Sequence, residues 1–371
     1  MDLKMEVYTP GLELMGMLEI QRSVIWEEKA FSAGSFSVES LITAESLALL
    51  QPENIIWIEG ETAGIIECIQ ENAGQDGLYI TVKGRTLTGI LDRRILWGLY
   101  SLNDTAPAIM RQLVNDCCVS PARGDAEARK IPGLVLADAP AGGDKIRFQK
   151  TGGTLLEVLE QLGEAYGVAF GVRFDPAIPR MEFWTRWGVD RSVHQTENEP
   201  VFYSTELDDV LASEYTYNSG NFRNVSLVAG EGEGCGRTMI SIDPGGASGL
   251  SRRELFVDAR DLKSDGDPDK PLTPAEYTAA LTDRGREKLA ENQLVQSFAA
   301  DARTYDPTYT YGGDYQLGDT ITVTDERLGV TADAVVQGVE RSVGAQGEGL
   351  TLTLGYGQPN IYDILKRKAE K

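Results

Sequence analysis

Short runs of alternating apolar and polar residues constrain this chain most, because a two-residue period favours β-strands over helices. The clearest run is LYITVK at residues 78–83, in which every second side chain is apolar. Similar runs recur along residues 3–75, separated by turn signals such as Pro10 followed by Gly11. About six strands at such short intervals are typical of a barrel or a sandwich.

Gly84 and Thr86 follow the clearest run and predict where it ends. Gly84 has no Cβ and permits a sharp turn, so we expect the strand to stop there. Thr86 is a suitable N-cap, and Leu87, Ile90 and Leu91 follow it at near-helical spacing. The sequence therefore predicts a short amphipathic helix directly after the strand.

Longer helices are predicted only in the middle of the chain. Thr105 opens one helix that continues through IMRQLVNDCC. Thr154 with Glu157 predicts a capping box for a second helix, and Thr273 with Glu276 predicts one for a third. Between the last two helices, VAFGVRFD and MEFWTRW alternate as two strands of a hairpin.

Together these patterns predict an α+β protein in which two β-barrel-like modules flank smaller α+β insertion domains. The expected parts are an N-terminal barrel (1–98), an α+β insertion (99–200), a second barrel (201–230 and 294–357), a loop-and-helix insertion (231–293) and a C-terminal tail (358–371).

The charge of the chain excludes some classes of partner. Its 57 acidic and 35 basic residues give a net charge of −22, which should repel nucleic acid and anionic membranes. The acidity is consistent with simple solubility, and also with a channel wall that DNA slides past without binding. No apolar run is long enough to span a membrane, and the N-terminus does not have the pattern of a signal peptide.

Metal and cofactor sites are not indicated. The four cysteines form no CxxC pair and no Cys/His cluster, so we expect reduced thiols and no zinc. Asp265, Asp267 and Asp269 resemble half of a calcium loop, but Pro268 and Pro271 interrupt it. The GEGEG segment at residues 230–234 contains no phosphate-binding motif. We therefore expect no metal and no cofactor.

Catalysis and sugar binding find little support in the residues. The lone histidine, His194, lies in a polar stretch with no partners that could be assigned, so we expect a surface loop. Carboxylate pairs for glycoside hydrolysis could be chosen almost anywhere among so many acids. Phe183, Trp184 and Trp187 could stack on a sugar, although alternating aromatics on a hairpin more often belong to a core.

Two charged segments are candidates for contacts between parts. Asp92, Arg93 and Arg94 form a cluster suited to a subunit or domain boundary, although a weak surface ion-pair cluster is the simpler interpretation. In GDYQLGDTITV, Asp314 and Asp319 can accept backbone hydrogen bonds in turns before a strand.

Four stretches resemble the hub proteins of phage and prophage tails, a family similar to the central hub of contractile-tail baseplates. They are WEEKAFSAGSFSVE at residues 26–39, the pattern V-x-G-R-x-L-x-x-I-L-x-R-R-I at 82–95, VAGEGEG at 228–234 and GGDYQLGDTITV at 312–323. Their order and spacing extend the resemblance over nearly the whole chain.

The resemblance implies a homotrimer in which each chain contributes two barrels, so that three chains form a pseudo-sixfold ring. Such a ring would join a tail tube or distal tail protein above to a spike, fibre or tip protein below. It would line the path of DNA or effectors in a virion tail or a tail-like injection particle assembled in the host cytoplasm. Asp92, Arg93, Arg94 and Asp319 would then lie at subunit or domain interfaces.

Two other classes of function stay open at this point. A tail-associated cell-wall hydrolase would depend on one carboxylate pair, and a carbohydrate-binding adhesin would expose Trp184 and Trp187 in a groove. We expect no enzymatic activity, because the chain has a lone histidine and no nucleophile or metal motif.

Overall fold

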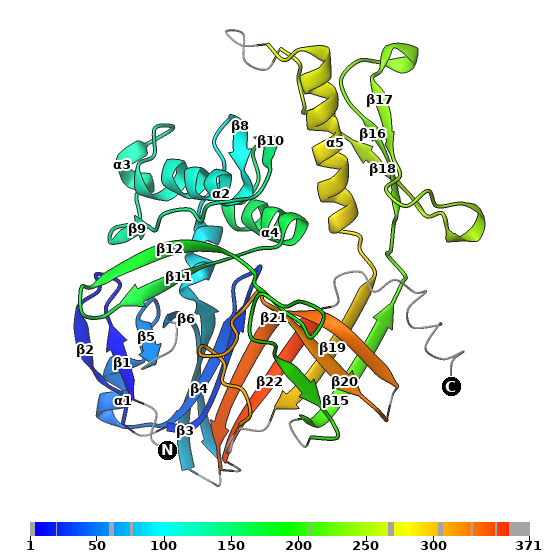
Figure 1. Cartoon of the computed structure of the whole chain (residues 1–371). Helices are drawn as coiled ribbons and strands as arrows, with labels where there is room; N and C mark the ends of the chain where they lie inside the picture. The colour runs from blue at the N-terminus through cyan, green and yellow to red at the C-terminus, as the bar shows by residue number, and fades with distance from the viewer. Residues whose placement is uncertain are drawn as a thin grey trace.

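The computed structural model describes residues 4–19, 21–58, 63–74, 77–207, 210–265, 271–302, 307–327, 329–345 and 347–355. One 14-stranded sheet joins the two ends of the chain (Figure 1). Along it the strands run in the order β15 (Val210–Asn218), β19 (Val295–Ala302), β22 (Gly347–Gly355), β21 (Val330–Gly344), β3 (Gln21–Lys29), β4 (Ser35–Leu41), β7 (Gly77–Thr86), β6 (Ala63–Gly74), β5 (Ile55–Ile58), β1 (Met5–Tyr8) and β2 (Leu14–Met17). β20 (Thr320–Asp325) pairs with β21 and also with β13 (Asp190–Arg191) and β14 (Phe202–Ser204).

The N-terminal half of the sheet confirms the predicted alternation. In β4 the buried residues are Phe36, Val38 and Ser40, while the residues between them are more exposed. Their inner face and its neighbours form one apolar core, which the short helix α1 (Ala44–Leu49) borders through Leu49.

The prediction that Gly84 ends its strand is wrong, since β7 continues to Thr86. A Cβ on Gly84 would lie 1.8 Å from the carbonyl oxygen of Ile65, so the glycine permits close approach of β6. The register of that pair shifts between Ile66 and Cys68, which makes this part of β6 a bulge.

The expectation of two separate barrels is also wrong. β21 and β3 pair antiparallel from Val343 opposite Val24 to Gly338 opposite Lys29, which makes one continuous sheet of the two modules. This pairing satisfies the edge groups that each module would otherwise leave open. No pairing among the described strands joins β2 to β15, so the sheet is open. It carries two cores, one on each half.

The first insertion packs helices on small sheets. It contains η1 (Leu87–Arg93), β8 (Leu99–Thr105), α2 (Ala106–Val114), η2 (Asn115–Val119), α3 (Ala126–Arg129), β9 (Leu134–Leu136), β10 (Lys145–Thr151), α4 (Leu155–Tyr166), β11 (Val168–Asp175) and β12 (Arg180–Trp187). β8 pairs with β10, and β11 and β12 form the predicted hairpin, which β9 joins.

The caps of these helices follow the sequence only in part. Thr86 is the N-cap of η1 as predicted, but η1 is a 3₁₀-helix and the Thr86 hydroxyl binds the amide of Gly34 instead. The capping box predicted at Thr154 is wrong, because its side chain makes no cap and Leu155 N donates to Arg94 O. Gly167 ends α4 at φ 68°, as a glycine in the left-handed region does.

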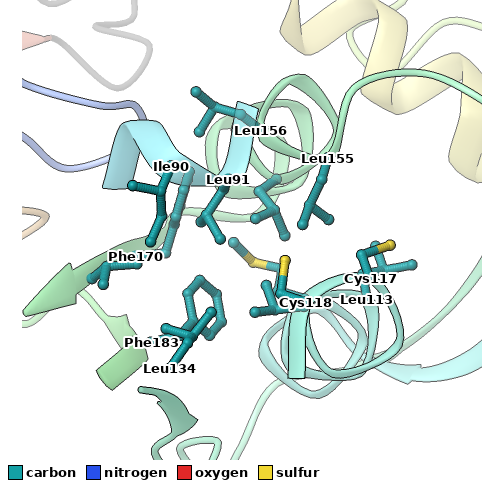
Figure 2. Packing of buried hydrophobic residues seen from close by; sticks show 14 of the residues in the cluster. Ile90, Leu91, Leu113, Cys117, Cys118, Leu134, Leu155, Leu156, Phe170 and Phe183 are labelled. Carbon is teal, nitrogen blue, oxygen red and sulfur yellow. The ribbon is translucent and has the colours of Figure 1, made fainter. Parts of the chain in front are cut away.

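This insertion shares its core with the N-terminal module. Figure 2 shows Ile90 and Leu91 of η1 among side chains of α2, α4 and the β11–β12 hairpin. The same cluster contains Tyr8 and Ile65 from the large sheet. One apolar cluster therefore extends from the first insertion into the N-terminal part of the large sheet, beside the separate core of that half.

The second insertion, residues 219–293, is named the arm below. It consists of β16 (Val225–Ala229), β17 (Met239–Ile242), β18 (Glu254–Asp258), two short 3₁₀ turns, η3 (Gly234–Gly236) and η4 (Gly249–Ser251), and α5 (Pro274–Ala290). β16, which we expected in the second barrel, pairs instead with β17 and β18. The capping box of Thr273 and Glu276 is confirmed at the start of α5. None of the described helices is long and apolar enough to cross a membrane.

Candidate functional site

Asp319 is the centre of a polar cluster where the end of β12 meets the second half of the large sheet. Its carboxylate is fully buried and accepts hydrogen bonds from Arg186 Nη2 and, at 2.8 Å, from the amide of Val189 on one oxygen. The other oxygen accepts from Arg191 Nε at 3.2 Å and from the amide of Gln316 at 3.0 Å. Two cations and two amides thus offset the cost of burying this charge.

Two glycines allow the chain to form this cluster. A Cβ on Gly188 would lie 1.9 Å from the carbonyl oxygen of Gly318, and Gly318 itself has φ +87°. The close contact lets Thr320 donate to Val189 O at 3.0 Å and start the parallel pairing of β13 with β20. Asp319 therefore fixes the end of the β12 strand against the second half of the large sheet.

Asp92, Arg93 and Arg94 all have partners within the same chain. Asp92 accepts from Arg85 at 3.1 Å, and Arg93 donates to Glu53 at 2.5 Å. Arg94 Nε donates at 2.7 Å to the carbonyl oxygen of a residue in α3, so it ties the end of η1 to α3. No hydrogen bond or ion pair of the described residues joins these three to Asp319, so the structure forms two separate clusters.

The candidates for chemistry lie in ordinary structural surroundings. His194 lies on the surface, 2.8 Å from Asp333 Oδ2, while Asp333 Oδ1 accepts from the hydroxyl of Thr322. Within the described ranges no three His, Cys, Asp or Glu side chains are grouped to hold a metal. Of the calcium candidates only Asp265 is described, and Asp267 and Asp269 lie outside the described residues.

The aromatic residues of the β11–β12 hairpin belong to packing. Phe183 is 1% exposed within the shared core, and Trp187 packs against that core. Trp184 packs against the core of the second half of the sheet and lies close to Gly171. Neither tryptophan is exposed in a groove as an adhesin would require.

The exposed face of the large sheet carries an acidic row that the sequence did not reveal. Glu340 lies opposite Glu27 on one side and opposite Thr351 on the other, and Thr351 lies opposite Asp301. Burial together with Glu27 and Asp301 raises the pKa of Glu340. These acids are far apart in sequence, so only strand register brings them together.

Three basic residues of the same face are bound to acids, while Lys83 of β7 is exposed. Ion pairs join Arg22 to Glu39 at 3.2 Å, Lys29 to Glu27 at 3.3 Å and Arg85 to Glu67 at 2.9 Å. These pairs neutralise the three cations locally, so this part of the face offers little attraction to a polyanion.

β2 is a second feature that the sequence did not mark. It is one end of the open sheet, and Leu14, Met15 and Met17 on it are 58%, 43% and 41% exposed. Leu18 N donates to Met5 O, so the amide of the preceding Met17 faces away from β1. An apolar edge strand with outward amides can accept a further strand. The only sequence signal was the poor alternation of LELMGM.

No curated protein matches the chain. A tail protein from Neisseria meningitidis MC58 is similar at 16% identity and TM-score 0.55, over 96% of both chains. The 43 kDa tail protein of prophage MuSo2 from Shewanella oneidensis is similar at 14% identity and TM-score 0.55, over 95% of this chain and 98% of that one. Prophage tail protein gp18 from Listeria monocytogenes EGD-e gives 13% identity and TM-score 0.55 over 99% and 98%.

These structures share the overall fold of the chain over at least 95% of its length. The family model described as "Siphovirus ReqiPepy6 Gp37-like protein" matches residues 4–356. The chain therefore belongs to the family of siphovirus ReqiPepy6 Gp37-like proteins.

Proposed function

We propose that this protein is the structural hub of a phage tail or of a tail-like injection particle. Three copies form a ring with pseudo-sixfold symmetry, which joins the tail tube above to a spike, fibre or tip protein below. DNA or effectors pass through the ring without specific binding, and the protein has no catalytic role. The fold shared with solved tail proteins over nearly the full chain supports the placement in a tail.

One observation carries the ring: the large sheet is open, with β2 and β15 at its opposite ends. A sheet with two different free edges can join edge to edge with copies of itself, and such head-to-tail contacts close into a ring when the rotation fits. In this proposal each half of the sheet, with its own core, acts as one module, so that three chains supply six.

The acidic row supports the proposed path. We place the face with Glu27, Glu340 and Asp301 toward the opening, where a sliding polyanion meets carboxylates and neutralised cations. Arg93 and Arg94 lie away from that opening in this proposal, at the junction of the first insertion or against a neighbouring subunit.

Solution mass tests the ring directly. We expect a mass about three times 40.5 kDa for the purified chain. Replacing Met15 and Met17 with Lys adds charge to the β2 edge and should reduce the mass to that of one chain. The matched control is Ile178→Lys, because Ile178 is 59% exposed on the turn between β11 and β12. A native chain that is monomeric, or an edge variant that stays trimeric, would contradict the proposed contact.

A further inference from the structure

The arm leaves and re-enters the large sheet at a single place. β15 ends at Asn218 and β19 begins at Val295, and these two residues are register partners. Both connections therefore start at one edge of the sheet, from which the arm projects (Figure 1). An element joined through two adjacent strand ends can rotate about them as about a hinge.

The contact between the arm and the first insertion is polar. Arg147 of β10 donates to Glu276 at 2.7 Å through its side chain and to Asp283 at 3.2 Å through its amide. Arg284 of α5 donates to the carbonyl oxygen of Gln149 at 2.6 Å. Of the buried apolar clusters among the described residues, none contains side chains from both sides of this contact. Separating the two surfaces therefore exposes little apolar area.

Glu287 lies at the centre of this contact. Its side chain is 11% exposed, and its nearest cation is Arg284, whose Nε lies 3.6 Å from the carboxylate. On α4, the hydroxyl of Tyr166 is buried with no hydrogen-bond partner. Burial raises the pKa of Glu287 to about 7, although Arg284 and Lys150 act against this. A buried carboxyl in such surroundings is more stable in its neutral form.

We propose that the arm is a hinged unit that is latched against β10 and α4 while the carboxyl of Glu287 is protonated, and that it is released when this carboxyl ionises. The ionised group gains water when the arm swings out, whereas the neutral group is tolerated in the closed contact. The device does not depend on the proposed function.

The direction of the pH effect follows from linkage. A carboxyl with a raised pKa in the docked arm favours docking fully below its ordinary value of 4.5, and this preference is lost as the pH rises through about 7. From Glu287 alone, the docking constant should fall by up to about 300-fold across this range.

Other ionisable groups face Glu287 or line the same contact. They are Asp283, Arg284, Arg286 and Lys288 on α5, Glu291 directly after α5, Lys150 on β10, and Glu160, Glu164 and Tyr166 on α4. Burial raises the pKa of Asp283 and of Glu164, so both act in the same direction as Glu287.

Two groups at the contact act in the opposite direction. Burial lowers the pKa of Lys150 below its ordinary value of 10.5. The neutral form of Lys150 therefore favours docking, and this preference is complete only above pH 10.5. Hydrogen bonds from Thr273 and Arg147 lower the pKa of Glu276 below 4.5. The ionised form of Glu276 therefore favours docking, and this preference is already complete above pH 4.5. The fall between pH 5 and 8 is therefore set by the buried carboxyls, to which Glu287 contributes with Asp283 and Glu164.

Amide hydrogen exchange, corrected for the intrinsic effect of pH, measures docking in the whole chain. The reporters are the peptides with the amide of Arg147, which donates to Asp283, and the amide of Lys263, which donates to Gln149. In the native chain their exchange should be at least about tenfold faster at pH 8 than at pH 5.5. Peptides of β3, β4 and β7 should not change.

Glu287→Gln keeps the shape of the neutral carboxyl and cannot ionise, so its reporters should stay protected at both pH values. The matched control, Glu254→Gln, makes the same chemical change on the arm at an exposed residue paired with Arg252 and should behave as the native chain does. An E287Q chain with the native pH dependence would overturn the proposal. If E287Q does not fold, small-angle scattering of the native chain decides, because an unchanged maximum dimension between pH 5.5 and 8 contradicts release.

Discussion

The two insertions of this chain are built alike but attached differently. Each packs helices against small sheets, yet the first shares one apolar cluster with the N-terminal module, whereas the arm has a separate cluster of six buried residues. The contact between the first insertion and the N-terminal module is apolar and includes Tyr8 and Phe174, whose ring centroids lie 4.7 Å apart edge to face. The arm contacts the first insertion through hydrogen bonds and ion pairs. An α+β composition alone therefore does not decide whether an insertion shares its core with the rest of the chain.

The largest expected effect follows the truncation of a core side chain, and the two insertions should differ in how far that destabilisation extends. Phe170→Ala removes a side chain that is 1% exposed in the shared core and should lower the free energy of unfolding by about 4 kcal/mol. Leu281→Ala in the arm removes a fully buried leucine, but its effect should stay within the arm. Hydrogen exchange in β3 and β4 should rise in the first variant only. A rise in both variants would mean that the arm folds as one unit with the sheet.

A smaller effect is expected at the junction that Asp319 fixes. Asp319→Ala leaves Arg186 and Arg191 without their buried partner and should cost about 3 kcal/mol in denaturant unfolding. Exchange should increase at the start of β20 before it increases in β3. A cost below about 1 kcal/mol would show that the cluster adds no more than a surface pair.

The smallest effect is expected at Arg93. Its pair with Glu53 is solvent-exposed, with side chains 36% and 51% accessible, so Arg93→Ala should change the stability of one chain by about 0.5 kcal/mol. In the proposed ring the same substitution tests an interface role. A loss of trimer without loss of stability would assign Arg93 to the subunit contact, and no change in either would leave it a surface pair.

The sequence predicted local features where neighbours along the chain decide them. The alternation of β4, the β11–β12 hairpin and the capping box of α5 were all found. Each depends on a few consecutive residues.

Features that depend on distant residues were missed. The pairing of β21 with β3 joins residues about 300 positions apart, and the capping box predicted at Thr154 is absent. The turn carboxylate at Asp319 was expected, but its two arginines were not, because they come from another module. In the sequence Glu287 has the pattern of a surface residue on a helix, and it is buried only because α4 and β10 pack against α5.

The central claim is that three chains close into a ring around an open path, and a reconstruction of the purified assembly by electron cryomicroscopy tests it most directly. The account predicts threefold symmetry, with β2 of one chain beside β15 of the next and an opening of at least about 20 Å, the width of a DNA duplex. The row of Glu27, Glu340 and Asp301 should face that opening. A closed centre without a movable plug, a wall lined by lysine and arginine, or Arg93 and Arg94 both projecting into the opening would contradict it.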